Sequence, residues 1–165
     1  MSTPHAGPMV AVVTVSDRAF GGQRADATGP ALRDRLAELG FETTLTVVPD
    51  EAAEITRAIE AAVTLGARAV VTTGGTGISP RDVTPEGTAP LIARDLPGIP
   101  ELLRQRDAAA NPAVALSRGR AGVTGHHPPA LVINLAGSAS AVESALEVLP
   151  GILRHGVSML DGGDH

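Results

Sequence analysis

At 165 residues the chain has the length of a single domain with one sizeable core, and its 43% hydrophobic and 19% charged residues are typical of a globular protein. The absence of cysteine excludes disulfides, zinc–thiolate sites and thiolate nucleophiles. Because all 13 Lys-or-Arg positions hold arginine, a Walker A lysine and Schiff-base chemistry are excluded as well. The net charge of −5, the lack of a basic run and the scarcity of aromatic residues argue against a nucleic-acid-binding protein.

The N-terminal segment is not expected to be a signal peptide. Residues 1–8 are polar and lack the basic and apolar regions of a signal peptide. No apolar run approaches the roughly 20 residues that a membrane-spanning helix needs. We therefore expect a cytoplasmic protein without membrane contact, with a flexible N-terminus at 1–8, one domain at 9–160 and a C-terminal tail at 161–165.

The first half of the chain alternates apolar runs with amphipathic segments. Thr28 is a candidate N-cap for a helix with leucines at helical spacing, and Gly40 is expected to end that helix. In chain order, the sequence predicts a strand at 10–16, a loop at 17–27, a helix at 28–40, a strand at 41–48, a helix at 51–65, a strand at 67–73 and a loop at 74–83.

Proline and glycine interrupt the second half more often. Thr84 and Pro85 are expected to begin a helix whose apolar positions include Leu91 and Ile92. Beyond it, the sequence predicts a shorter helix at 97–106, a strand at 112–117, a Gly/Pro-rich connection at 119–129, a strand at 130–135, a helix at 137–149 and a weaker helix at 152–160.

Near-continuous apolar strands that alternate with helices are typical of a parallel sheet covered on both faces. We expect an α/β fold: a single-domain, three-layer sandwich around a mostly parallel sheet. Because its crossover connections are right-handed, the loops that follow the strands emerge at one edge, where such sheets bind ligands. Residues 16–18, Asp50, residues 74–82 and residues 136–138 are therefore expected to lie close together.

A glycine-rich loop follows the third predicted strand. Gly74, Gly75, Thr76 and Gly77 form a segment whose backbone can fold around an anion and present its N–H groups. It is not a dinucleotide-binding fingerprint, since Pro80 stands where G-x-G-x-x-G, counted from Gly75, requires glycine. The alternative is a tight turn without a ligand.

Two aspartates, Asp50 and Asp82, come directly after or close to predicted strand ends. Each has an ordinary explanation, because Asp50 is a candidate helix cap and Asp82 a candidate turn residue. As a pair, however, they could hold Mg²⁺ against a phosphate chain, since their like charges repel without a cation. Both are therefore candidate catalytic residues and metal ligands.

Other strand ends supply hydroxyl groups, guanidinium groups and backbone N–H groups at a helix start, all of which suit phosphate or base recognition. For each the alternative is ordinary, namely a solvated arginine or, for the last serine, a helix cap. The candidate ligand-binding residues, besides the glycine loop, are Ser16, Asp17, Thr73, Ser117, Arg118, Asn134, Leu135, Gly137 and Ser138.

Seven short segments in family order make the chain resemble the molybdopterin-binding MogA/MoaB family, which is related to the G domain of gephyrin and of its plant counterpart. The segments cover most of residues 10–150 and are T-V-S-D-R at 14–18, V-P-D-E at 48–51, T-T-G-G-T-G at 72–77, R-D-V-T-P-E at 81–86, L-P-G at 96–98, L-S-R at 116–118 and I-N-L-x-G-S at 133–138.

The resemblance implies adenylylation of molybdopterin with ATP as the second substrate, Mg²⁺ as the cofactor and pyrophosphate as the by-product. In family members the aspartates that match Asp50 and Asp82 are tied to catalysis and metal handling. The serine that matches Ser117 and the glycine loop lie in the pterin and nucleotide site. The resemblance also implies a homotrimer, with a molybdenum-insertion enzyme as a candidate partner.

The chain departs from the family pattern at three positions. Ala136 and Ala139 replace prolines, which is expected to loosen the turn while keeping its N–H groups. Gly87 stands where alanine is usual, at a cost of about 1 kcal/mol of helix propensity.

Two alternatives to an enzyme stay open: a non-catalytic, MoaB-like molybdopterin-binding or scaffold protein, and a flavodoxin-like flavin binder.

Overall fold

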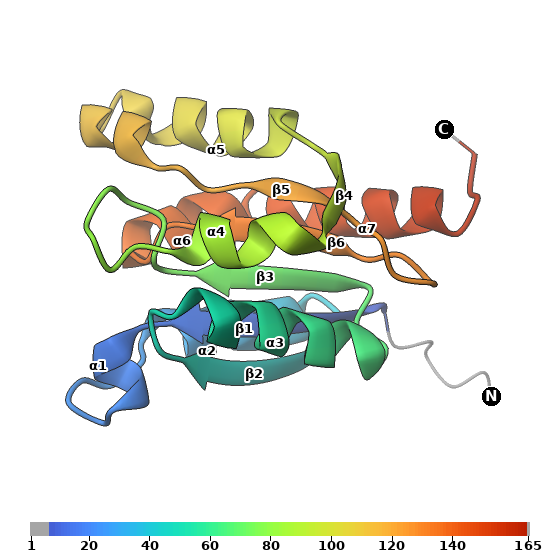
Figure 1. Cartoon of the computed structure of the whole chain (residues 1–165). Helices are drawn as coiled ribbons and strands as arrows, with labels where there is room; N and C mark the ends of the chain where they lie inside the picture. The colour runs from blue at the N-terminus through green and yellow to red at the C-terminus, as the bar shows by residue number, and fades with distance from the viewer. Residues whose placement is uncertain (1–6, 165) are drawn as a thin grey trace.

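A six-stranded sheet forms the centre of the computed structural model, which describes residues 7–164 (Figure 1). The predicted N-terminal segment 1–8 and C-terminal tail 161–165 lie partly outside the described residues. The strands are β1 (Met9–Val15), β2 (Glu42–Val48), β3 (Ala69–Thr73), β4 (Ile92–Asp95), β5 (Ala121–Thr124) and β6 (Leu131–Leu135). Their order across the sheet is β2-β1-β3-β6-β5-β4.

Most of this sheet is parallel. The neighbours β2, β1, β3 and β6 pair in parallel, whereas β5 is antiparallel to both β6 and β4. All residues of β3 and β6 are buried, as expected for strands covered on both faces. The predicted α/β class with a mostly parallel sheet in three layers is confirmed.

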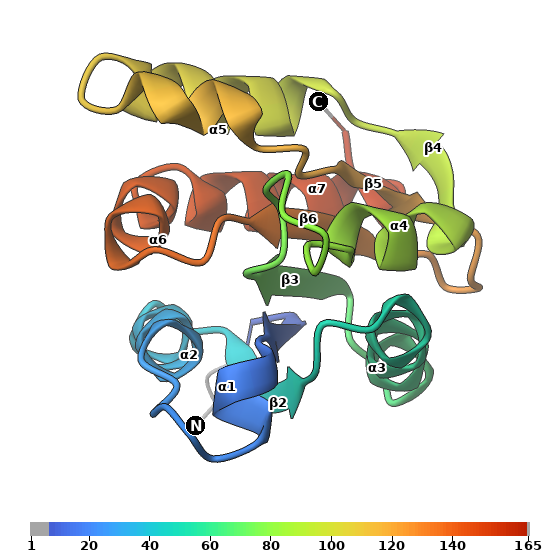
Figure 2. The same cartoon turned by 60° about the vertical axis from the view of Figure 1, so that its left-hand side comes forward.

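Helices cover both faces of the sheet. Figure 2 shows α2, α6 and α7 on one face and α3 and α4 on the other. The helices are α1 (Asp17–Phe20), α2 (Thr28–Glu38), α3 (Ala52–Thr64), α4 (Thr84–Thr88), α5 (Gly98–Ala108), α6 (Ala139–Leu146) and α7 (Leu149–Leu160), with 3₁₀ turns η1 (Ala89–Leu91) and η2 (Pro112–Leu116).

The alternation of side chains along the strands divides the core into two apolar clusters. Val10 and Val12 of β1 face the cluster that contains Leu32 of α2 and residues of α6 and α7. Ala11 and Val13 face the opposite cluster, which contains the isoleucines of α3. The sheet is therefore held from both sides, and its strand ends are rigid supports for the loops that follow them.

The segment from 84 to 124 differs from the sequence prediction. The helix that begins at Thr84 ends at Thr88, and Ile92 lies in β4, because Pro90 lacks the N–H group that an α-helix needs. The predicted strand at 112–117 is the 3₁₀ turn η2, whose N-cap Asn111 accepts a hydrogen bond from Ala113 N at 3.1 Å. The predicted connection at 119–129 contains β5.

Smaller differences concern helix ends. The predicted loop at 17–27 begins with α1, and the 137–149 and 152–160 helices are observed as α6 and α7, which meet near Leu149. Thr28 does not cap α2; Asp26 Oδ1 accepts the hydrogen bond from Gly29 N at 3.1 Å. Asp50 does not cap α3, whose N-cap position is Glu51 without a side-chain bond.

Gly87 has a packing reason within α4. A Cβ atom at this position would lie 2.8 Å from both Ala52 O and Ile55 Cβ of α3. Glycine therefore lets α3 and α4 approach more closely than alanine would, and this close packing offsets its weaker helix propensity.

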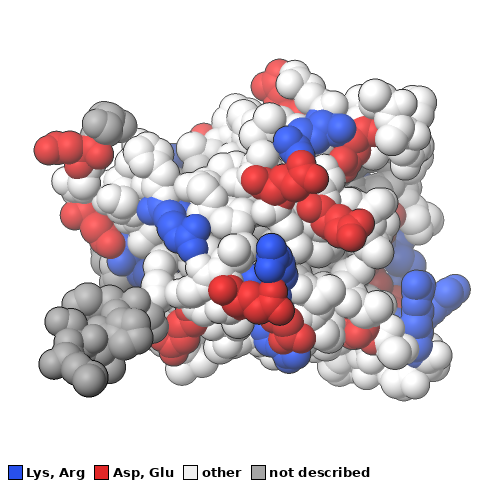
Figure 3. Space-filling view, turned by 180° about the vertical axis from the view of Figure 1, so that it is seen from behind, with Lys and Arg blue, Asp and Glu red and all other residues white. Residues whose placement is uncertain are grey.

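The surface carries charges of both signs. On the face shown in Figure 3, arginine side chains lie among acidic side chains rather than in a separate patch. Within residues 7–164, no helix is long and apolar enough to cross a membrane.

Candidate functional site

The carboxyl ends of β1, β2, β3 and β6 meet at one edge of the sheet, as the parallel arrangement requires (Figure 1). Backbone hydrogen bonds join neighbouring ends: Ser16 N donates to Val48 O at 2.9 Å, and Gly74 N donates to Leu135 O at 3.0 Å. The structure thus brings together strand-end segments that are scattered in the sequence.

The glycine loop after β3 needs glycine for its own conformation. Gly74 and Gly75 have φ angles of +99° and +67°, which side chains disfavour. A Cβ atom on Gly74 would lie 2.4 Å from Val15 O, and one on Gly75 would lie 2.3 Å from Thr84 Oγ1. Thr84 Oγ1 also donates to Gly74 O at 2.9 Å. The loop is therefore a tight, fixed turn, whatever ligand it binds.

Asn134 anchors this edge from within the core. Its side chain is buried, and Nδ2 donates to Thr72 Oγ1 at 2.9 Å and to Thr88 Oγ1 at 3.1 Å. Its Oδ1 accepts a hydrogen bond from Arg120 N at 3.0 Å. The Asn134 side chain thus connects β6 to β3 and α4, and its predicted contact with a ligand stays a prediction.

Arg118 braces the glycine loop. Its Nε donates to Gly77 O and its Nη2 donates to Asp82 O, both at 2.8 Å, while Nη1 pairs with Glu86. The hydrogen bond from Arg118 lowers the pKa of the Glu86 carboxyl, and the same bond raises the pKa of the guanidinium. The structure therefore places the guanidinium against the loop and its neighbours, and the predicted phosphate contact of Arg118 stays a prediction.

Asp82 lies next to Gly77, the last glycine of the same loop. Its Oδ2 accepts a hydrogen bond from Ser79 N at 3.0 Å and lies 2.8 Å from the place where a Gly77 side chain would begin. This bond is the turn interaction that the sequence offered as an alternative. Asp82 also lines the adjoining cavity, so the turn role does not remove it from the site.

Asp50 and Asp17 are joined by two reciprocal hydrogen bonds. Asp17 N donates to Asp50 Oδ2, and Asp50 N donates to Asp17 Oδ1, both at 2.9 Å. Arg81 completes the arrangement, since its Nε and Nη2 donate to Asp17 Oδ2 at 2.9 and 2.7 Å. The Oδ1 atom of Asp50 faces the glycine loop, 3.3 Å from the Cβ position of Gly75.

The two carboxyl groups of this pair differ in acidity. The hydrogen bond from Asp50 N, followed by those from Arg81, lowers the pKa of Asp17. Burial raises the pKa of Asp50, and the negative charges of Asp17 and Asp82 act in the same direction. The negative charges of Asp82 and Asp50 thus repel each other, as expected for two like charges.

The Mg²⁺ site expected at these two acids would need further ligands from a substrate. Among residues 7–164, no group of three or more His, Cys, Asp or Glu side chains is arranged to hold a metal ion alone. Mg²⁺, however, commonly uses one or two carboxylates together with substrate phosphates and water. Within the same residues, Asp50 and Asp82 each use Oδ2 as a hydrogen-bond acceptor, which leaves Oδ1 for a cation.

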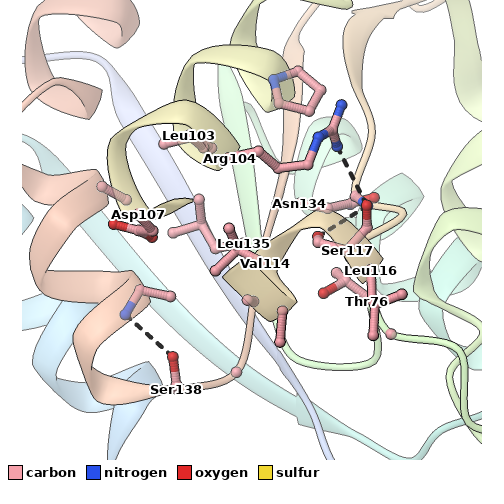
Figure 4. Close-up of a pocket in the computed structure, with 18 of the residues that line it drawn as sticks. Thr76, Leu103, Arg104, Asp107, Val114, Leu116, Ser117, Asn134, Leu135 and Ser138 are labelled. Carbon is pink, nitrogen blue, oxygen red and sulfur yellow. Dashed lines mark hydrogen bonds between the residues drawn. The ribbon is translucent and has the colours of Figure 1, made fainter. Parts of the chain in front are cut away.

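A cavity of about 430 Å³ adjoins the glycine loop. Figure 4 shows α5 and η2 along one side of the cavity, with Leu103, Arg104 and Val114 directed toward it. The sequence-predicted residues that line it are Gly74, Gly75, Thr76, Gly77, Asp82, Ser117, Asn134, Leu135, Gly137 and Ser138. Polar loops thus form one side of the cavity and a largely apolar helical segment forms the other.

Four of the predicted residues, two at the cavity and two outside its lining, make local hydrogen bonds. Ser117 lies at the cavity, and its carbonyl oxygen accepts from Arg104 Nη1 at 3.3 Å, whereas Ser138 caps α6 by accepting from Ala141 N at 3.2 Å. Ser16 caps α1 by accepting from Ala19 N at 3.2 Å. Thr73 Oγ1 donates to Ala136 O at 3.3 Å, so it joins the ends of β3 and β6.

Sequence reasoning missed Arg81 and the α5 side of the cavity. Arg81 stands directly before Asp82 in the R-D-V-T-P-E segment, a position that could have drawn attention to it. Leu103 was expected only as part of the predicted helix at 97–106, and Arg104 and Asp107 were not singled out. Their place at the cavity depends on the course of β4 and β5, which the sequence did not reveal.

The fold and the site define an α/β domain with a cavity at the carboxyl edge of a mostly parallel sheet, where such sheets bind ligands. A family model described as "Probable molybdopterin binding domain" matches residues 11–155. The chain therefore belongs to this molybdopterin-binding family of molybdenum cofactor biosynthesis proteins.

Individual relatives agree with this assignment. The chain is 40% identical over 161 residues to a molybdenum cofactor biosynthesis bifunctional protein of Synechococcus elongatus, covering 97% of the chain and 50% of the relative. It is 37% identical over 146 residues to a molybdopterin adenylyltransferase of Pyrococcus furiosus, covering 87% and 86%. The crystal structure of the tungsten cofactor synthesizing protein MoaB from Pyrococcus furiosus matches with a TM-score of 0.87, 33% identity and coverage of 96% and 99%.

These matches confirm the MogA/MoaB resemblance and disfavour a flavodoxin-like flavin binder. The strand order β2-β1-β3-β6-β5-β4, with antiparallel β5, also differs from the flavodoxin-like order 2-1-3-4-5. The match covers 50% of the Synechococcus relative, so the chain spans about half of that protein's length.

Proposed function

We propose that this domain transfers the adenylyl group of ATP to a phosphate of molybdopterin and releases pyrophosphate. The observation that carries the proposal is the placement of Asp50 and Asp82 at the glycine loop that borders the 430 Å³ cavity. The relative named molybdopterin adenylyltransferase supports the same reaction.

The reaction needs positioning more than it needs covalent participation of the protein. A phosphate oxygen of molybdopterin forms a bond to the α-phosphorus of ATP, while the bond from that phosphorus to the oxygen bridging to the β-phosphate breaks. Pyrophosphate leaves with this bridging oxygen and the bonding electron pair. Because the attacking oxygen is already anionic, no proton has to be removed, and the site must align two anions and balance their charge.

Asp50 and Asp82 are the residues that would hold Mg²⁺ in this reaction. When bound, the ion supplies positive charge to the phosphate oxygens. The acids themselves would repel ATP, and the chain has no lysine to offset them. Backbone N–H groups of the glycine loop add donors, whose positions are fixed by Thr84 and Arg118.

The cavity is the proposed pterin site. Its volume of about 430 Å³ lies within the range of about 300–1,000 Å³ that small-molecule sites occupy. Leu103 and Val114 supply apolar surface for a ring system, and Ser117 supplies a hydroxyl group. The backbone of 136–138 lies at the start of α6, where N–H groups favour an anionic group.

An assay with purified protein, molybdopterin, ATP and Mg²⁺ tests the proposal. Pyrophosphate and adenylylated pterin should appear in equal amounts, and neither should form when molybdopterin or Mg²⁺ is left out. Binding of molybdopterin without either product would instead indicate the non-catalytic, MoaB-like binding or scaffold protein. The MoaB structure among the relatives makes that second outcome a specific alternative.

The homotrimer and the molybdenum-insertion enzyme partner belong to the same proposal. Sedimentation equilibrium of the purified chain should give three times the mass of 16.7 kDa. A monomer that is active in the adenylylation assay would contradict the trimer while leaving the reaction in place.

A further inference from the structure

We propose that Asp17 is a positioning residue for Asp50, and that Arg81 holds Asp17 in that role. The inference rests on the proposed function, because Asp50 is assigned to the transfer site there. It gives Asp17 a role that differs from the ligand contact expected from the sequence.

The two hydrogen bonds between Asp17 and Asp50 run in opposite directions. Asp17 N donates to Asp50 Oδ2 and Asp50 N donates to Asp17 Oδ1, each at 2.9 Å, across a sequence separation of 33 residues. One bond fixes the carboxylate of Asp50, and the other fixes its backbone. Together they allow less rotation of the Asp50 side chain than a single bond would.

Both carboxylate oxygens of Asp17 already accept hydrogen bonds. Oδ1 accepts from Asp50 N, and Oδ2 accepts two bonds from Arg81, at 2.9 and 2.7 Å. Arg81 comes from the segment after the glycine loop, so the loop, β1 and β2 meet at this carboxylate. A contact between Asp17 and a substrate would have to displace one of these partners, which favours positioning over direct binding.

The backbone of Asp17 is fixed as well. Ser16 lies at the N-cap of α1 and accepts a hydrogen bond from Ala19 N, while its own N–H donates to Val48 O at 2.9 Å. Asp17 is therefore held at its backbone by α1 and β2 and at its side chain by Arg81. This support lets Asp17 transmit a fixed geometry to Asp50.

Stability alone does not explain the arrangement. The side chains of Arg81 and Asp17 are 62% and 39% exposed, and ion pairs at such exposure contribute little to the free energy of unfolding. Displacement of a reacting group or its ligand by about 1 Å, in contrast, can slow a reaction about 100-fold. The main consequence of losing Asp17 should therefore appear in turnover.

The test compares Asp17→Ala, Asp17→Asn and Arg81→Gln with the control Asp95→Ala. Asp95 also pairs with an arginine, Arg120, at 2.8 Å, but it lies on β4 away from the glycine loop. Amide hydrogen exchange of Asp50 N–H, read by NMR, reports the positioning bond without ATP. Steady-state kinetics then gives kcat, the KM for ATP and the KM for molybdopterin.

We expect faster exchange of Asp50 N–H in Asp17→Ala and a fall in kcat of about 100-fold, with both KM values and the melting temperature close to those of the control. Asp17→Asn keeps an oxygen for Asp50 N but presents a donor to Arg81, and Arg81→Gln leaves the two reciprocal bonds in place but weakens the support of Asp17. Both should therefore fall between Asp17→Ala and the wild type in exchange rate and in kcat.

A double-mutant cycle separates positioning from direct contact. In an Asp50→Asn background, Asp17→Ala should reduce kcat little further, because its effect passes through Asp50. Multiplicative losses, or unchanged exchange of Asp50 N–H in Asp17→Ala, would overturn the inference. Wild-type protein that releases no pyrophosphate would instead contradict the proposed function, while the exchange measurement would still decide whether Asp17 positions Asp50.

Discussion

The glycine loop has two dissimilar sides. On one side lies the acid rim, which consists of Asp17, Asp50, Arg81 and Asp82. Hydrogen bonds of 2.7–2.9 Å join the first three, and Asp82 accepts a separate bond of 3.0 Å from Ser79 N. On the other side lies the pocket wall, which consists of α5 and η2. Within α5, all of which is described, Pro100 is the buried residue, and Arg104 Nη1 donates to the carbonyl oxygen of Ser117, at the end of η2, at 3.3 Å.

This difference suggests a division of work between the two sides. Groups that must be aligned for a transfer reaction belong on a rigid support, as the acid rim provides. A wall with little buried surface can adjust to the ligand that it covers. Changes in the acid rim should therefore alter turnover, whereas changes at the cavity should alter substrate binding.

Asp82→Asn should have the largest effect. The substitution keeps an acceptor for Ser79 N, so the turn should persist, but it removes the negative charge needed for Mg²⁺. We expect kcat to fall about 100-fold or more, by analogy with the loss of one electrostatic contact in other enzymes. The rate of pyrophosphate release measures this fall. Near-normal turnover with retained molybdopterin binding would show that Asp82 is not needed for the transfer reaction.

Gly87→Ala tests the close packing of α4 against α3, the helix that follows Asp50. The added Cβ would meet Ala52 O and Ile55 Cβ at 2.8 Å, and overpacking of this kind costs about 1–3 kcal/mol, more than the gain of about 1 kcal/mol in helix propensity. Urea unfolding should show a net loss of stability. The matched control is Gly151→Ala in α7, where a Cβ meets nothing within 4 Å; it should be neutral or stabilising. Equal effects of the two substitutions would contradict the packing explanation.

Ala141→Leu should affect the cavity without affecting the acid rim. Ala141 lines the cavity from α6, and a larger side chain there should raise the KM for molybdopterin about tenfold while leaving kcat nearly unchanged. Ala37→Leu makes the same change at an exposed position of α2 and serves as the control. An unchanged KM in Ala141→Leu would place the pterin elsewhere.

Glu86→Gln should have the smallest effect and should depend on pH. Because Arg118 lowers the pKa of Glu86 in the folded protein, the pair stabilises the fold above the unfolded pKa of glutamate, about 4.3. This contribution is lost as the pH falls through the lower folded pKa. Thermal unfolding should separate wild type from Glu86→Gln at pH 7, and the difference should shrink toward pH 3. A difference in thermal stability that grows as the pH falls would contradict the stabilising role of the Glu86–Arg118 pair.

The sequence predicted the parallel part of the fold because its strands are long apolar runs. It missed β5 because of Gly122, which weakens the strand pattern. The structure shows why glycine stands there: a Cβ would lie 2.4 Å from Ile92 Cγ2 and 2.7 Å from Arg94 O of β4. The glycine that allows β5 to pair closely with the edge strand β4 is therefore also the residue that concealed β5.

The candidate site, like the fold, could be predicted only in part. Asp50 and the glycine loop could be predicted because each follows a recognisable strand, alternating in β2 and apolar in β3, and the ends of parallel strands meet at one edge. The partner of Asp17 could not, since Arg81 is 64 residues away and no local pattern links them. The pocket wall was missed because its place depends on β4 and β5.

The rate of pyrophosphate release at saturating molybdopterin, compared between Ala141→Leu and Asp82→Asn, tests the division between cavity and rim most directly. Saturation should return Ala141→Leu to nearly the wild-type rate and leave Asp82→Asn about 100-fold slower. Equal rates in the two variants, or recovery of Asp82→Asn alone, would show that binding and transfer are not divided between the two sides of the glycine loop.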